Sequence, residues 1–217
     1  MEKYLFMKPV LQLISQGGFF RKVSSIFLKI IATAVLLSGL VMFFKLWKVI
    51  FELPASAMIG GFIFQLFFIV AVYMVLHTLL IRAFDIDVLP DSEFTVIPII
   101  SISLKLIGEI YASFLSVIAV GGGILLWFAG YRGGLILEGI TGSLPWISNI
   151  QVFDQENFLG GLMFILSGLI MAFFFLIFFY LLSELTIILV NIAKSTKKVS
   201  DVFEKSTINK VDANEET

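Results

Sequence analysis

Residues 158–183 read FLGGLMFILSGLIMAFFFLIFFYLLS and contain no charged side chain. A helix rises about 1.5 Å per residue, so this stretch is long enough to cross the roughly 30 Å of hydrocarbon in a bilayer. Lipid offers no hydrogen-bonding partner to a peptide group, and a helix satisfies its own backbone within one segment. The stretch is therefore predicted to cross a membrane as an α-helix.

Three further stretches have the same character. The first of them contains Lys29 as its single charge. The four predicted spans cover residues 23–44, 55–83, 99–129 and 158–193. They predict an all-α integral membrane protein whose four transmembrane helices form an up-down bundle. Two flanking parts complete the chain, namely a cytoplasmic or interfacial segment at residues 1–22 and a polar cytoplasmic tail at 194–217, expected to be disordered beyond about Lys205.

The composition of the whole chain is typical of a protein dissolved in lipid. Of the 217 residues, 59% are hydrophobic and 14% are charged, and the mean hydropathy is +1.03. A soluble domain carries about 25% charged residues, so a soluble globular enzyme is excluded. The 24 phenylalanines argue against a disordered chain. A net charge of -1 offers no global basic surface for nucleic acid, and the absence of cysteine excludes thiolate catalysis and cysteine metal sites.

Lysine and arginine are distributed unevenly between the two ends of the spans. Twelve of them lie at the end that carries both termini: Lys3, Lys8, Arg21, Lys22, Lys29, Arg82, Lys105, Lys194, Lys197, Lys198, Lys205 and Lys210. The opposite end has Lys45, Lys48 and Arg132. Cytoplasmic connections are enriched in positive residues, so both termini are predicted to be cytoplasmic. The expected location is a bacterial cytoplasmic (inner) membrane, with a eukaryotic membrane as the alternative.

The tryptophans give a second indication of orientation. Trp47, Trp127 and Trp146 all fall at the predicted outer end. Indole rings settle at the headgroup level of a bilayer. The aromatic residues and the positive residues thus favour the same topology.

Five ionisable residues form a candidate intramembrane polar layer: Lys29, His77, Lys105, Glu109 and Glu184. An ionisable group inside hydrocarbon costs about 2.5 kcal/mol or more, so it normally faces protein or water, or reaches the interface. The predicted topology places all five in the cytoplasmic half. A pairing of Glu109 or Glu184 with Lys29 or Lys105 is the favoured interpretation. A proton or ion pathway is less favoured, because no second acidic or histidine layer continues it outward.

Small residues mark the expected contacts between helices, since membrane helices associate through close backbone approach. The third span carries a stripe within about 40° of one line, comprising Ser101, Lys105, Glu109, Ala112, Ser116, Ala119 and Gly123. We expect this stripe to face protein and the third span to be the central helix. The fourth span has two contact faces. One carries Gly161, Gly168, Ala172, Ser183 and Thr186, and the second carries Tyr180, Glu184 and Asn191.

Two connections are informative. The connection from Gly130 to Asn157 is long, rich in glycine and apolar, which predicts a cap against the outer membrane surface or another subunit. The connection between the second and third spans carries Asp85, Asp87, Asp91 and Glu93. Their spacing fits no defined ion-binding loop, so a solvated loop is expected.

Motifs of catalysis are missing from the sequence. There is no GlyXaaSerXaaGly elbow and no HisGluXaaXaaHis motif, and His77 is the single histidine. No catalytic, cofactor-binding or metal-binding residue is predicted. The leading hypothesis is a non-catalytic accessory, assembly or regulatory subunit that contacts lipid and, within the membrane, a protein partner or a second copy. The alternative is a small oligomeric transporter or channel that uses the polar layer, since Gly121, Gly122 and Gly123 favour an interrupted helix.

Overall fold

The computed structural model describes residues 17–90, 96–141 and 158–215, with the backbone alone at 17, 140, 141 and 201–215. The predictions made for residues 1–16, for Asp91 and Glu93 and for 142–157 lie outside the described residues. The described chain consists of four helices: α2 (Gly17–Phe51), α3 (Ala55–Asp87), α4 (Val96–Thr141) and α5 (Phe158–Glu215). All four are long and apolar enough to cross a membrane, which confirms the predicted number of candidate spans.

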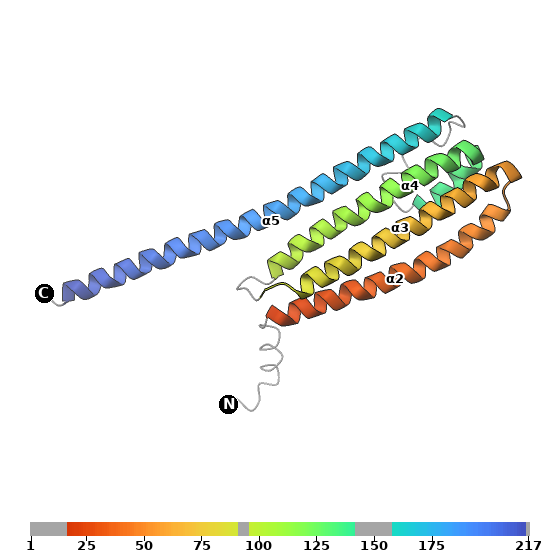
Figure 1. Cartoon of the computed structure of the whole chain (residues 1–217). Coiled ribbons are helices and arrows are strands. Elements are labelled where there is room, and N and C mark those ends of the chain that lie inside the picture. The colour runs from red at the N-terminus through yellow and green to blue at the C-terminus, as the bar shows by residue number, and fades with distance from the viewer. Residues whose placement is uncertain (1–16, 91–95, 142–157, 216–217) are drawn as a thin grey trace, which may run out of the picture.

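The helices lie side by side in the order of the sequence and alternate in direction (Figure 1). Helix α4 contacts α2, α3 and α5, as expected of the central helix. Within the described residues, α5 contacts no helix other than α4. The arrangement of the described helices is therefore an open row, and one side of α5 is not covered by the described chain.

Two apolar clusters hold the row together. One joins α2, α3 and α4 near the start of α2 and includes Leu79 and Leu106. The other includes Phe64 from α3, Leu125 from α4 and Phe164 from α5. Burying a large apolar side chain between helices excludes lipid and gives close dispersion contact, which is the main stabilising contribution in a membrane. Many other large apolar side chains on all four helices are exposed, as expected where acyl chains surround a membrane helix.

Proline residues help to set the helix boundaries. Pro54 precedes the first residue of α3 and adopts φ -58° and ψ 151°. Pro90 follows the end of the same helix, where a proline cannot donate the hydrogen bond that would extend it. Pro98 lies in the first turn of α4, where backbone N–H groups have no partner within the helix.

The segment after Gly130 differs from the connection predicted there. Gly130 has φ 53° and ψ -133°, a conformation that L side chains rarely adopt, and it breaks α4 into two parts. The second part is helical to Thr141 and turns back beside the first (Figure 1). Leu137 is fully buried, and a Cβ built on Gly122 would lie 2.9 Å from its Cδ2 atom. Residues 131–141 thus pack on the chain itself.

Helix α5 continues well past its predicted span. It comprises 58 residues and ends at Glu215, so the disorder expected beyond about Lys205 was a wrong prediction. The stretch after Gly168 contains neither glycine nor proline, and nothing in it breaks a helix. At about 1.5 Å per residue the helix is about 87 Å long, several times the depth of a hydrocarbon core.

Candidate functional site

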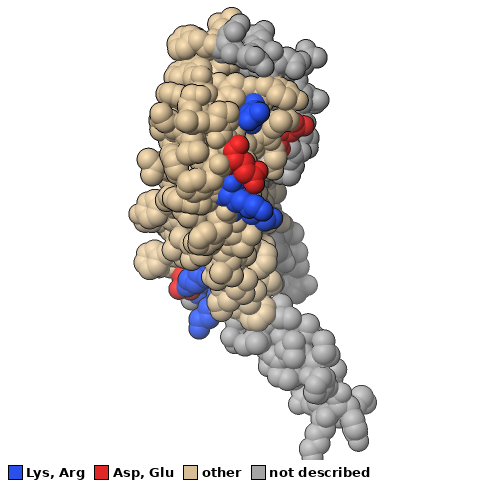
Figure 2. Space-filling view, turned by 90° about the vertical axis from the view of Figure 1, so that its right-hand side faces the viewer, with Lys and Arg blue, Asp and Glu red and all other residues tan. Residues whose placement is uncertain are grey.

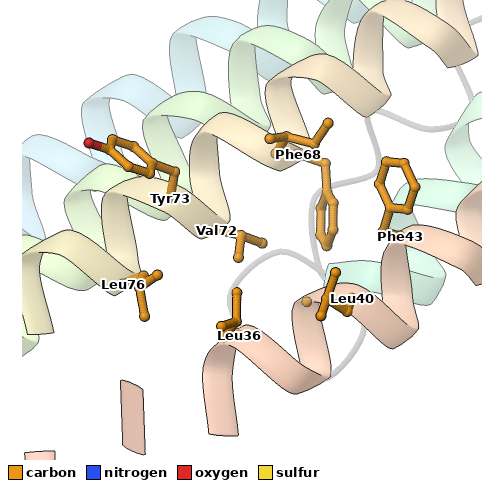
Figure 3. Close-up of a pocket in the computed structure, with 9 residues that line it drawn as sticks. Leu36, Leu40, Phe43, Phe68, Val72, Tyr73 and Leu76 are labelled. Atoms are coloured by element: carbon orange, nitrogen blue, oxygen red, sulfur yellow. The ribbon is translucent and has the colours of Figure 1, made fainter. Parts of the chain in front are cut away.

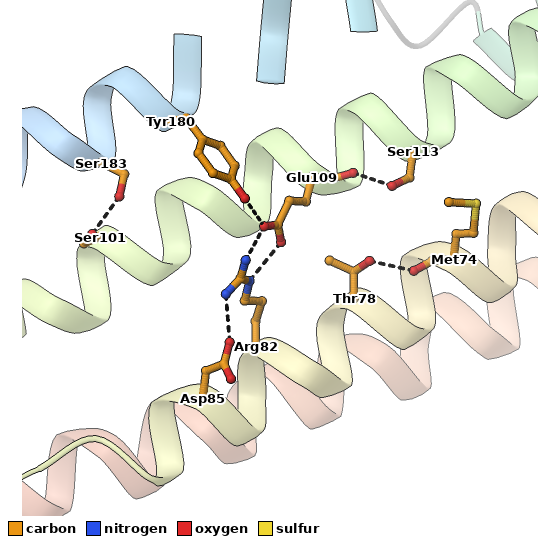
Figure 4. Close-up of polar contacts among 9 residues, drawn as sticks. All are labelled: Met74, Thr78, Arg82, Asp85, Ser101, Glu109, Ser113, Tyr180 and Ser183. Atoms are coloured by element: carbon orange, nitrogen blue, oxygen red, sulfur yellow. Dashed lines mark hydrogen bonds and ion pairs between the residues drawn. The ribbon is translucent and has the colours of Figure 1, made fainter. Parts of the chain in front are cut away.

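A charged network joins α3 and α4 near the end where α2 begins. Arg82 Nε donates a hydrogen bond to Glu109 Oε2 at 2.8 Å, and Arg82 Nη2 donates to Glu109 Oε1 (Figure 4). The third guanidinium nitrogen, Nη1, donates to Asp85 Oδ2 at 2.8 Å, one turn along α3. The Arg82 and Glu109 side chains are 22% and 17% exposed. The Arg82–Glu109 ion pair is bidentate, and bidentate arginine–carboxylate pairs are among the stronger ion pairs in proteins.

Helix α5 reaches the same carboxylate through Tyr180. The phenol OH donates to Glu109 Oε1 with an oxygen–oxygen distance of 2.6 Å. Lys105, one turn before Glu109 on α4, holds its Nζ atom 5.5 Å from the centre of the Tyr180 ring. Glu109 therefore receives hydrogen bonds from two other helices, and this fixes how α3 and α5 are rotated against α4.

A second polar contact between α4 and α5 lies closer to the helix end. The hydroxyl oxygens of Ser101 and Ser183 are 2.7 Å apart, and both side chains are buried (Figure 4). Ser101 precedes Glu109 by about two turns, and Ser183 follows Tyr180 by about one. The two contacts together define the register of the antiparallel pair α4 and α5.

The structure brings together only part of the predicted polar layer. Lys105 and Glu109 lie in the network described above. Lys29 and Glu184 are exposed, and His77 is exposed and stacks on Tyr73 with ring centres 5.7 Å apart. The sequence favoured a pairing of Glu109 or Glu184 with Lys29 or Lys105, but Glu109 forms its ion pair with Arg82.

The partners of Glu109 are instead Arg82 and Tyr180. The sequence predicts Arg82 only as one of the positive residues at the end with both termini, and Tyr180 as part of the second contact face of the fourth span. The spacing along the second span could have indicated that Arg82 faces another helix. Arg82 follows Leu79 by three residues and precedes Ala83 by one, and both of these residues are buried, so Arg82 lies beside the buried face of α3. Arginine also binds a carboxylate at two points, which lysine cannot do.

The predicted small-residue contacts line the α4–α5 interface. A Cβ built on Gly168 would lie 2.3 Å from the Cβ of Ala119. A Cβ on Gly123 would lie 2.7 Å from the carbonyl oxygen of Gly161, so the two backbones touch there. Ala119 and Ala172 are each 2% exposed. Ala112 and Ser116 are partly exposed.

At the opposite end of the row, polar groups are fewer. Gln65 is buried and donates from Nε2 to the carbonyl oxygen of Phe43 at 3.1 Å, while its Oε1 atom has no hydrogen-bond partner among the described residues. Trp127 donates from Nε1 to the carbonyl oxygen of Phe158 at 2.9 Å and stacks on the ring of the same residue. These contacts tie α2 to α3 and α4 to α5.

Two of the grooves on the surface of the described chain lie between packed segments. One, of about 240 Å³, lies between α2 and α3, and its lining is hydrocarbon apart from the side chain of Tyr73 (Figure 3). The other, of about 490 Å³, lies between the end of α2 and the part of α4 after Gly130 and is lined partly by Lys45, Glu52 and Arg132. Figure 2 looks onto this end of the molecule and shows acidic and basic side chains near one another on a largely uncharged face.

The described residues offer little chemistry beyond these contacts. No three His, Asp or Glu residues among them are grouped in a way that could hold a metal ion. Comparison of the chain with protein-family models, with curated proteins and with solved structures gives no match. The network holds α3, α4 and α5 together at one point, because the Glu109 carboxylate is bound by both Arg82 and Tyr180.

Proposed function

We propose that the protein is a non-catalytic membrane component that acts as an accessory, assembly or regulatory subunit through its helix faces. The observation that carries this proposal is the position of α5. It contacts α4 alone among the described helices, and large side chains such as Phe174 and Leu189 on its other sides are 62% and 67% exposed. A long helix at the edge of an open row has a full face available to another polypeptide.

The hydrogen bonds that Glu109 and Arg82 form within this chain support a structural role over catalysis. Both oxygens of Glu109 accept hydrogen bonds from residues of this chain, and Arg82 bonds to Asp85 as well as Glu109. A general acid or a nucleophile needs a group free to meet a substrate. Glu109 and Arg82 have each other instead, so their arrangement favours helix positioning.

The spacing of charges and tryptophans supports a placement in the bilayer. Lys29 precedes Trp47 on α2, and Glu109 precedes Trp127 on α4, by about 18 residues in each case, which corresponds to about 27 Å. That is about the thickness of a hydrocarbon core. Our proposal places the tryptophans at the outer headgroups and the charged level, with both termini, at the cytoplasmic side of a bacterial inner membrane.

A small oligomeric transporter or channel is the second candidate, and an unpaired polar atom in the outer half is the observation that favours it. Helix α4 is continuous through Gly121, Gly122 and Gly123, where the sequence favoured an interruption, and it breaks at Gly130, three residues past Trp127. The unpaired Oε1 of Gln65 gives the same half of the molecule one polar atom without a partner among the described residues. Solute flux in proteoliposomes tests this candidate, with Glu109→Gln and Glu184→Gln as variants. Flux that both substitutions leave unchanged would exclude the polar layer as its route.

Native mass spectrometry after extraction in a mild detergent tests the leading proposal. We expect a complex of defined stoichiometry rather than a monomer carrying lipid alone. Phe174→Ala on α5 is expected to weaken that complex, whereas Phe44→Ala, on an equally exposed position of α2, is not. A monomer from every extraction, unaffected by either substitution, would overturn the proposal.

A further inference from the structure

Helix α5 extends past the rest of the described molecule. Ser183 bonds to Ser101, and α4 begins at Val96, about five residues before that serine. Because α4 and α5 are antiparallel, α4 accompanies α5 only to about Ile188. From there α5 continues past the other described helices to Glu215 (Figure 1). These remaining residues correspond to about 40 Å of helix.

The start of this projecting part carries an apolar stripe. At 100° per residue, its members fall within about 40° of one line: Leu185, Leu189, Ile192, Thr196 and Val199. All five are exposed, with Leu189, Ile192 and Val199 at 67%, 57% and 54%. They are separated by four, three, four and three residues. This is the spacing of the two core positions, a and d, in the seven-residue repeat of a coiled coil.

Charged residues avoid this stripe. Lys194, Lys197 and Lys198 all lie about 120° or more away from its centre. The positions that flank the stripe are occupied by neutral side chains, including Ala193, Ser195 and Ser200. From Lys194 the segment is thus amphipathic, whereas before it Ile187 and Val190 make the opposite side apolar as well. No described helix covers the stripe.

The shape of the surface fits the same pattern. A shallow hollow on α5 is lined by Ile188, Asn191, Ile192, Ser195 and Thr196. In a coiled coil each core side chain inserts between four residues of the facing helix. Two of its lining residues, Ile192 and Thr196, belong to the stripe, so the hollow lies at the edge of the stripe and offers a neighbouring helix a place for a side chain. An isolated helix in water is marginally stable, and most helical stability in proteins comes from packing of the apolar side.

We infer that the stripe from Leu185 to Val199 is covered by the same stripe of a second copy, so that the protein self-associates through a parallel coiled coil of α5 helices. Two copies inserted in one membrane with the same topology present α5 in the same direction and at the same height. Neutral flanking positions leave no like-charge repulsion between identical chains. This inference rests on the proposed function and names the partner.

The absence of cysteine from the chain makes a direct test possible. Single substitutions Ile192→Cys and Val199→Cys place one thiol on the stripe, and Lys198→Cys places one on the opposite side as a matched control. Each full-length variant is oxidised in native membrane vesicles. Because a disulfide needs Cβ atoms about 4 Å apart, we expect the two stripe variants to form dimers at least about tenfold faster than the control. Equal rates in all three variants would overturn the inference.

A second measurement separates this inference from the proposed function. The same thiols are reacted with a water-soluble maleimide, before and after extraction in detergent. Stripe thiols that form no disulfide, yet react only after extraction, would show that another molecule covers α5; the self-association would then be wrong and the subunit proposal would stand. Stripe thiols that form no disulfide and react at once, in a chain that extracts as a monomer, would overturn both.

Discussion

Tyr180→Phe is the most informative single change in the network, because it deletes one hydroxyl and leaves the ring. In the structure that hydroxyl donates one hydrogen bond to Glu109, which joins α5 to α4. The oxygen–oxygen distance is 2.6 Å, and the charged acceptor strengthens the bond. Hydrogen bonds between membrane helices contribute about 0.6 kcal/mol on average, and a charged partner about doubles the strength. We therefore expect a loss of about 1.2 kcal/mol, or about eightfold in the unfolding equilibrium constant.

The loss is measured by unfolding the purified protein in mixed detergent and following tryptophan fluorescence. Tyr73→Phe is the control, since Tyr73 is 62% exposed and stacks on His77. Combining Tyr180→Phe with Glu109→Gln completes a double-mutant cycle, in which we expect the two effects to be coupled by about 1 kcal/mol. Equal effects of Tyr180→Phe and Tyr73→Phe, together with zero coupling, would refute the assigned contact.

Two further substitutions test the packing of α4, each by the same unfolding measurement. Gly168→Ala places a methyl group 2.3 Å from the Cβ of Ala119 and is expected to destabilise the protein by about 1–3 kcal/mol, whereas Gly139→Ala, which meets no atom within 4 Å, should not. Leu137→Ala removes most of a fully buried side chain and should lower the free energy of unfolding by about 2–5 kcal/mol. Leu135→Ala, at a position that is 50% exposed, should lower it by less than about 1 kcal/mol. Equal effects within either pair would contradict the packing of α4.

Much of the fold could be predicted from the sequence because hydrocarbon imposes strict requirements on a chain. Four apolar stretches of sufficient length predict four membrane-spanning helices, and the described part of the chain contains four helices long and apolar enough. The stripe with Ala119 and Gly123 indicated the face of α4 that meets α5, since small residues matter most where backbones touch. These features depend on local composition and on helical spacing, which a single sequence displays directly.

Other features depend on geometry between distant residues. Gly130 is one of several glycines in its region, and the sequence alone does not show which of them adopts the positive φ that lets Leu137 pack against the chain. Predicting the pairing of Glu109 with Arg82 requires knowing how far α3 and α4 are shifted along each other, and the signs of the charges do not give that shift. The helical continuation of α5 was missed because a polar composition alone was taken as a sign of disorder.

Photo-crosslinking from the exposed face of α5 in native membranes tests the central claim most directly. A photoreactive amino acid replaces Phe174, and a second protein carries it at Phe44 of α2, whose side chain is 68% exposed. The account predicts covalent protein adducts of defined mass from position 174 and lipid adducts from position 44. Lipid adducts alone from both positions would contradict it.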